Sequence, residues 1–302
     1  MPRETSSAEP TPSPIPHRIV QGETPAATED PNASDGSNES ATSRLEVPSP
    51  KLRLHVQDIT HRSATTFFRC FPDPEGVLHA ALSYIVMYLY ASPKSCRSQH
   101  ICFTPSLPPT RSVTLILRDF SGVAHTTSID LDVDHKEIHL SLAYIAHSAT
   151  LKDPIHELVG VLTHEMVHCY QHTCPPGSKS VPSPPSGLIE GIADFVRLKA
   201  GLSPPHWHRP LSCADLPDSW DRGYQDTAFF LEWLEDVKVG TGAVGLINDR
   251  LLRTGYVGEN NDTDASCTAS TKSFWRGLFG ASVQELWVEY RKYIDGQGGK
   301  RD

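Results

Sequence analysis

The sequence predicts an α+β fold, in which a twisted mixed sheet packs against helices and is followed by a mostly helical C-terminal part. Two observations carry this prediction. Segments with the alternating or continuous apolar pattern of strands lie between residues 51 and 145. From Pro154 onward, apolar residues instead recur at helical spacings, and prolines and glycines separate the successive runs.

The ordered domain is expected to span residues 49–295. Residues 1–48 are rich in Pro, Ser, Thr and Glu and hold few large apolar residues. Such a segment cannot bury enough surface to offset the entropy lost on ordering. We therefore expect a disordered tail there, passive rather than regulatory, and a flexible C-terminus at residues 296–302.

The first half predicts four strands and one helix. Residues 51–56 alternate between apolar and polar, as in a half-buried strand. The Asp-Pro pair that opens residues 73–90 is typical of a helix start. Residues 112–119 form an apolar run, and a Ser-Gly turn predicts that residues 123–129 return as the second strand of a hairpin. Residues 137–145 alternate and predict a further strand.

The second half predicts helices separated by proline-rich loops. Asp153-Pro154 starts the first of them, which should end before Pro175. A loop rich in Pro and Ser follows, and Gly201 is expected to end the next helix. The later helices are predicted at residues 187–200, 224–237, 242–252 and 283–293.

The helix that begins at Pro154 contains the motif H-E-x-x-H at residues 164–168. On a helix, His164 and His168 are one turn apart and share a face. Two imidazoles at that spacing can chelate one zinc ion, and Glu165 can then act as general base on the zinc-activated water. The motif therefore predicts a catalytic site with one zinc ion per chain.

A catalytic zinc needs three protein ligands and an open position for water. His172 is the nearest candidate, but eight helical residues separate it from His164 by about 12 Å along the axis. Zn–N bonds of about 2.0–2.1 Å cannot span that distance. Glu190 is the better candidate, because 22 residues after His168 leave room for a loop and a second helix. Asp194 lies one turn later and can accept the other ring N–H of a ligating histidine.

The alternative is that the motif is accidental and that Glu190 and Asp194 form a solvated helix face. Their apolar surroundings argue against this, since charges on a mostly buried helix need partners. Small residues at Gly191 and Ala193 should also let the two helices approach closely. The apolar neighbours are Leu188, Ile189, Ile192, Phe195 and Val196.

Zinc would polarise the scissile carbonyl of a peptide while Glu165 passes a proton to the leaving amine. A further donor should stabilise the oxyanion, and Tyr224 is the first candidate because it opens a helix after a loop. His206 and His208 are the second candidates, although exposed loop histidines are the simpler interpretation. The strand at residues 137–145 is expected to be an edge strand that pairs with an extended peptide.

These residues resemble the basic secretory protein family of plants, which also has bacterial and fungal members. The resemblance covers about residues 51–294 and implies a zincin-like metallopeptidase domain with a catalytic zinc, in which H-E-x-x-H and E-x-x-x-D pair as in gluzincins. It also implies an association with defence or secretion in plants. The matching segments are residues 162–171, 187–201, 220–224, 227–231, 274–275 and 286–287.

This chain departs from that family in charge and in its N-terminus. Its formal net charge is −9, and no apolar leader is visible. The charge argues against nucleic-acid and anionic-membrane partners, and no apolar run is long enough for a membrane span. We expect a monomer that acts on peptides or proteins, with the cytoplasm favoured over unconventional secretion as its location. The loop at residues 175–186 and the polar segment at 258–270 look longer than in the family.

The cysteines also indicate a protein that is not built around disulfide bonds. The chain has seven, at spacings that form no disulfide framework. Cys169 and Cys174 are expected to be buried thiols. Cys96 and Cys102 would pair only in an oxidising compartment.

Two other functions remain open at this point. The first is a non-catalytic binding protein in which the metal is structural or lost. The second is hydrolysis of an amide that is not a peptide. Retention of both histidines, of the Glu165 base and of the Glu190 ligand favours a zinc metallopeptidase.

Overall fold

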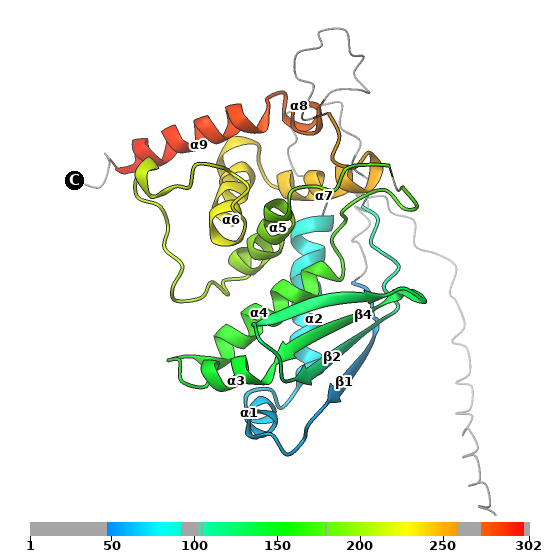
Figure 1. Cartoon of the computed structure of the whole chain (residues 1–302). Coiled ribbons are helices and arrows are strands. Elements are labelled where there is room, and N and C mark those ends of the chain that lie inside the picture. Colours follow the sequence, from blue (N-terminus) through cyan, green and yellow to red (C-terminus); the bar gives the residue numbers. More distant parts are fainter. Residues whose placement is uncertain (1–46, 92–102, 104, 179, 259–272, 299–302) are drawn as a thin grey trace, which may run out of the picture. The chain divides into compact units, whose positions relative to one another are not determined.

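The computed structural model describes residues 47–91, 103, 105–178, 180–258 and 273–298, and within these ranges every strand precedes residue 142 (Figure 1). Most of the expected tail, both cysteines of the 96–102 loop and nearly all of the 258–270 segment lie outside the described residues. The mixed sheet and the helices that follow it confirm the predicted α+β architecture. In chain order the elements are β1 (Lys51–Val56), α1 (Arg62–Cys70), α2 (Pro74–Ile85), the π-helix η1 (Val86–Tyr90), β2 (Ser112–Arg118), β3 (Ala124–Ile129), β4 (Asp132–Ser141), α3 (Leu142–Ser148), α4 (Pro154–His168), α5 (Ser186–Lys199), the 3₁₀ turn η2 (Cys213–Asp215), α6 (Tyr224–Trp233), the π-helix η3 (Leu234–Lys238), α7 (Ala243–Arg253), α8 (Phe274–Phe279) and α9 (Val283–Gly298).

The sheet has the order β1-β2-β4-β3. Strand β2 pairs in parallel with β1 on one side and with β4 on the other, whereas β3 pairs with β4 in the antiparallel direction. The predicted hairpin between residues 112–119 and 123–129 is therefore wrong, because β4 lies between these two strands. The edge strand next to β4 is β3, and the expectation that residues 137–145 form an edge is also wrong.

Strand β4 ends at Ser141 instead of continuing to Ile145. The Ser141 hydroxyl accepts a hydrogen bond from the Tyr144 backbone N–H, at 3.3 Å, and so caps helix α3. Leu142 and Ile145 are buried at helical spacing rather than on alternate faces. The apolar pattern of residues 137–145 thus spans a strand end and a helix start, which period-2 counting cannot separate.

The inner face of the sheet is apolar and packs against helices, with α4 crossing between the sheet and the later helices (Figure 1). Residues directly opposite each other on paired strands share a face. Thr126 of β3 lies opposite Ile138, so it points toward the same side as the core residues. The buried strand residues of this face are Val113, Leu115, Leu117, Ile138 and Leu140.

The predicted helix starts are confirmed at α2 and α4. Each begins with proline after an aspartate, and the aspartate side chain accepts a backbone N–H of the first turn. Asp73 accepts from Gly76, and Asp153 accepts from His156, both at 2.9 Å. Gly201 follows the end of α5 with a φ of 74°, as a C-terminal glycine should.

Three short helices were not expected from the sequence, α1, α3 and α8. Helix α1 is amphipathic, but its apolar residues are few and its hydrophobic side is confined to about two turns. Among the described residues, no helix combines the length and the apolar character that crossing a bilayer requires.

Candidate metal centre

Helix α4 carries the candidate site on one face. Glu157, Val161, His164 and His168 follow one another at intervals of three or four residues, so they share that face. All four line a pocket of about 700 Å³. Strand β3 and helix α5 supply further walls of this pocket.

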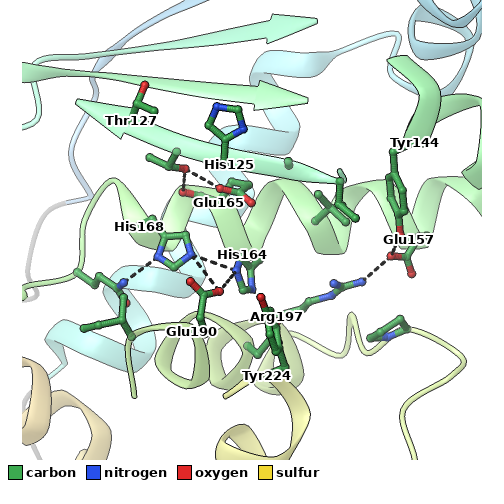
Figure 2. Close-up of a pocket in the computed structure, with 18 of the residues that line it drawn as sticks. His125, Thr127, Tyr144, Glu157, His164, Glu165, His168, Glu190, Arg197 and Tyr224 are labelled. Atoms are coloured by element: carbon green, nitrogen blue, oxygen red, sulfur yellow. Dashed lines mark hydrogen bonds and ion pairs between the residues drawn. The ribbon is translucent and has the colours of Figure 1, made fainter. Parts of the chain in front are cut away.

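The three predicted ligands converge in this pocket (Figure 2). The Nε2 atoms of His164 and His168 lie 3.1 Å apart, and the Glu190 Oε2 lies 3.1 Å and 3.8 Å from them, respectively. Three ligands placed tetrahedrally around zinc, with bonds of about 2.0–2.1 Å, would be separated by about 3.3 Å. The donor atoms and their separations therefore fit one metal ion.

Asp194 holds the first histidine in the tautomer that metal binding needs. Its Oδ1 lies 2.7 Å from the His164 Nδ1, and both side chains are buried. With a proton held on Nδ1 by this carboxylate, the ring in its neutral form would present the Nε2 lone pair toward Glu190 and His168. The contact joins the two residues that the sequence pattern paired, because Glu190 and Asp194 are one turn apart on α5.

The neighbouring charges shift the pKa values of His164 and Glu190 in opposite directions. Burial alone would lower the pKa of His164, but Asp194 and Glu190 outweigh it and raise this pKa to about 10. Hydrogen bonds from His164 and His168 hold the pKa of the Glu190 carboxyl well below its usual range. In the metal-free protein a proton on His164 thus stands in for part of the positive charge that a metal ion would supply.

Glu165 lies against the sheet, on the side of the three candidate ligands away from α5 (Figure 2). The Thr126 hydroxyl on β3 lies 2.7 Å from the Glu165 Oε2 and 3.0 Å from the Glu165 backbone carbonyl oxygen. This contact fixes the carboxylate between α4 and the edge strand (Figure 2). No local pattern in the sequence points to Thr126, because its position relative to α4 depends on how the strands pair.

Gln171 is a second residue at the site, besides Thr126, that was not predicted from the sequence. It follows the end of α4, and its side-chain amide nitrogen lies 2.8 Å from the His168 Nδ1. The spacing of three residues after His168 is a signal that could have found it, since residues i and i+3 meet on a helical turn.

Tyr224 lines the pocket, as predicted, at the start of α6. Its φ is 48°, the one positive value at a non-glycine residue within the described ranges. Figure 2 shows its hydroxyl directed toward the histidine–glutamate group, and the charge of Glu190 raises the pKa of Tyr224. A backbone held in this sparsely populated region is typical of functional sites.

Helix α5 meets the loop before Tyr224 at very short range. A Cβ on Gly187 would lie 1.8 Å from the Asp221 carbonyl oxygen, and a Cβ on Gly191 would lie 2.3 Å from the Thr227 Cγ2. The expectation that Gly191 serves the approach of α4 is therefore wrong, because Gly191 faces α6. The close approach between α4 and α5 occurs at Gly160, whose Cβ would lie 2.6 Å from the Arg197 Nε.

A buried ion pair joins α4 and α5 farther along the pocket. Arg197 donates to the Glu157 Oε1 at 3.1 Å, and the Tyr144 hydroxyl donates to the same oxygen at 2.8 Å. The Trp207 ring lies over the Arg197 guanidinium, with 5.6 Å between its centroid and the Arg197 Cζ. Tyr144, Glu157 and Arg197 lie at the end of the pocket away from His168 (Figure 2), and Trp207 also lines the pocket.

The remaining candidates lie apart from the three ligands. His172 is buried and its Nε2 lies 2.7 Å from the Ser106 carbonyl oxygen, so it belongs to the fold. His206 lines the pocket, whereas His208 does not. Cys169 is buried, and burial raises the pKa of its thiol. Cys174 is a free but exposed thiol, so the prediction of burial is wrong there.

A protein-family model matches most of this chain. The family model BSP, described as a peptidase of plants and bacteria, matches residues 49–290. This range contains the whole pocket together with the sheet. None of the curated proteins and none of the solved structures compared with the chain matches it.

Proposed function

We propose, from the premise that this chain belongs to the basic secretory protein family of plant and bacterial peptidases, that it hydrolyses peptide bonds with a catalytic zinc ion. One observation carries the zinc: two imidazole nitrogens and a carboxylate oxygen converge at the separations of tetrahedral coordination. Two nitrogen ligands and one oxygen ligand form a donor set typical of catalytic zinc. We assign His164, His168 and Glu190 as its ligands.

The residues around this group have separate tasks in the proposed reaction. Zinc, when bound, supplies a Lewis acid that activates a water molecule and polarises the carbonyl. Glu165 takes the proton of the attacking water and delivers it to the leaving amine. Thr126 keeps the Glu165 carboxylate in place for this transfer. Tyr224 donates its hydroxyl proton in a hydrogen bond to the developing oxyanion.

The substrate would run along β3. This strand forms the sheet edge beside the pocket, and residues 123–128 line the pocket directly. An extended peptide can add to such an edge through main-chain hydrogen bonds. The pairing strand is thus β3 rather than the segment expected from the sequence.

The rival function is a non-catalytic binding protein on the same fold. It would need the metal group but neither the base nor the oxyanion donor. The Thr126 contact to Glu165 and the strained backbone at Tyr224 favour catalysis, because a structural metal site makes no use of either. Hydrolysis of a non-peptide amide would use the same groups and differs only in the substrate.

Cleavage of a peptide library, with mass spectrometry of the products, tests the proposal. We expect cleavage by the purified protein, loss of cleavage after treatment with a chelator, and recovery on addition of one equivalent of zinc. Metal-bound protein that captures peptides without cutting them would favour the binding protein. Cleavage that survives complete removal of metal would contradict the zinc mechanism.

A further inference from the structure

The Gln171 side chain contacts the second metal-ligating histidine at the nitrogen that faces away from the metal group. The side chain is buried, with its residue 8% exposed, and its amide nitrogen lies 2.8 Å from the His168 Nδ1. Its buried Oε1 has no hydrogen-bond partner among the described residues. The amide therefore makes one bond, and that bond goes to the histidine ring.

The identity of the amide atom at this contact decides which histidine nitrogen can bind a metal. If the Gln171 N–H₂ donated to Nδ1, the neutral His168 ring would carry its proton on Nε2, which points at Glu190 and His164. A protonated Nε2 cannot ligate. Rotating the amide by 180° exchanges its oxygen and nitrogen without moving any other atom, and this orientation is assigned from bonding partners. The amide oxygen then accepts a proton from Nδ1, and Nε2 is free.

The segment that carries Gln171 is held from several parts of the fold. The Thr110 hydroxyl donates to the Cys169 carbonyl oxygen at 2.9 Å, and the Tyr90 hydroxyl donates to the Tyr170 carbonyl oxygen. The His172 backbone N–H donates to the Asn248 amide oxygen at 2.8 Å. The three residues around Gln171 are thus tied to three separate parts of the chain, which fixes the backbone that carries the amide beside the ring.

We infer that Gln171 is a positioning residue for the metal site, and that its side-chain oxygen accepts the His168 Nδ1 proton and so presents Nε2 to the metal. This inference rests on the proposed metal site. Asp194 does the same for His164, but with a charged oxygen. The two histidines are therefore held by one carboxylate and one neutral amide, so the contact to His168 adds no negative charge beside the ion.

Zinc affinity, measured by competition with a chromophoric chelator, tests the inference without reference to activity. Gln171→Met keeps the length of the side chain but removes the acceptor, and we expect it to weaken zinc binding about 10–100-fold. Gln171→Glu restores an acceptor, so it should bind zinc at least as tightly as the wild type. Gln225→Met, on α6, is the matched control and should leave the affinity unchanged. If Gln171→Met fails to fold, as judged by circular dichroism, the zinc affinity of Gln171→Glu tests the inference alone: binding at least as tight as in the wild type supports it, and weaker binding overturns it.

Nitrogen-15 NMR of the zinc-loaded protein gives the second readout. His168 should show a protonated, slowly exchanging Nδ1 in the wild type and in Gln171→Glu. Two results would overturn the inference: Gln171→Met binds zinc like the wild type, or Gln171→Glu weakens zinc as much as Gln171→Met does. Failure of the wild type itself to bind zinc would instead remove the metal site on which the inference rests.

Discussion

At the scale of single residues, the protonation of His164 links the site to pH. Burial disfavours its charged form, but two carboxylates within hydrogen-bond distance dominate and raise its pKa to about 10. The metal-free ring therefore carries a proton near neutral pH. A metal ion binds only the deprotonated nitrogen, so metal binding must displace this proton.

Zinc affinity should consequently rise with pH. Between about pH 7 and pH 9 we expect the dissociation constant for zinc to fall close to tenfold per pH unit, which corresponds to about 1.4 kcal/mol. Isothermal titration calorimetry in buffers of different ionisation enthalpy should detect the released proton. Asp194→Asn, which removes one of the two carboxylates, should flatten this dependence. An affinity that does not change over the interval would contradict the protonated state of His164.

The sequence predicted which residues come together in the candidate metal centre, because the candidate ligands follow local spacing rules. Helical spacing joins His164 to His168 and Glu190 to Asp194, and both pairs meet as expected. Thr126 could not be found in this way. Its contact with Glu165 depends on the register of β3 against β4, and therefore on pairing between strands that the sequence pattern assigned to a different partner.

At the scale of elements, three contacts fix the relative positions of the helices and the loop that line the pocket. Helices α4 and α5 run antiparallel and are joined by His164 with Asp194 at one level and by Glu157 with Arg197 at another. Helix α5 in turn contacts the loop before Tyr224 at Gly187. A change in any of these contacts should therefore shift candidate site residues on α4 and α5 relative to each other, or shift Tyr224 relative to α5.

Substitution of Gly187 tests this arrangement. A Cβ there would meet the Asp221 backbone oxygen at 1.8 Å, which a backbone carbonyl cannot easily avoid. We expect Gly187→Ala to lower the free energy of unfolding by about 1–3 kcal/mol or more, as overpacking does. Chemical denaturation measures the effect.

Gly296, on α9, provides the matched control. No heavy atom lies within 4 Å of a Cβ built there, so Gly296→Ala should be neutral or stabilising by up to about 1 kcal/mol. Equal behaviour of the two variants would contradict the close contact between α5 and the loop before Tyr224.

At the scale of the whole molecule, the pocket lies where the sheet edge meets the helical second half. Strand β3 forms one wall, and α4 and α5 form the others. The sequence predicted the α+β class and most helices, because helical periodicity and Asp-Pro caps are local signals. It did not predict the strand order, because the parallel pairing of β2 with β4 joins segments about 20 residues apart with β3 between them in the chain. The prediction that residues 137–145 form the edge strand was wrong for the same reason, because the strand order determines which strand lies at the edge.

The substitution Glu165→Gln tests the central claim, that a metal group and a separate base cleave peptides. Gln keeps the size of the side chain and removes its ability to accept a proton. We expect the variant to retain about one zinc per chain by elemental analysis, while its rate of peptide cleavage falls at least about 10²-fold. Glu75→Gln, at an exposed position on α2, should behave as the wild type in both assays. A Glu165→Gln protein that cleaves peptides as fast as the wild type would contradict the account.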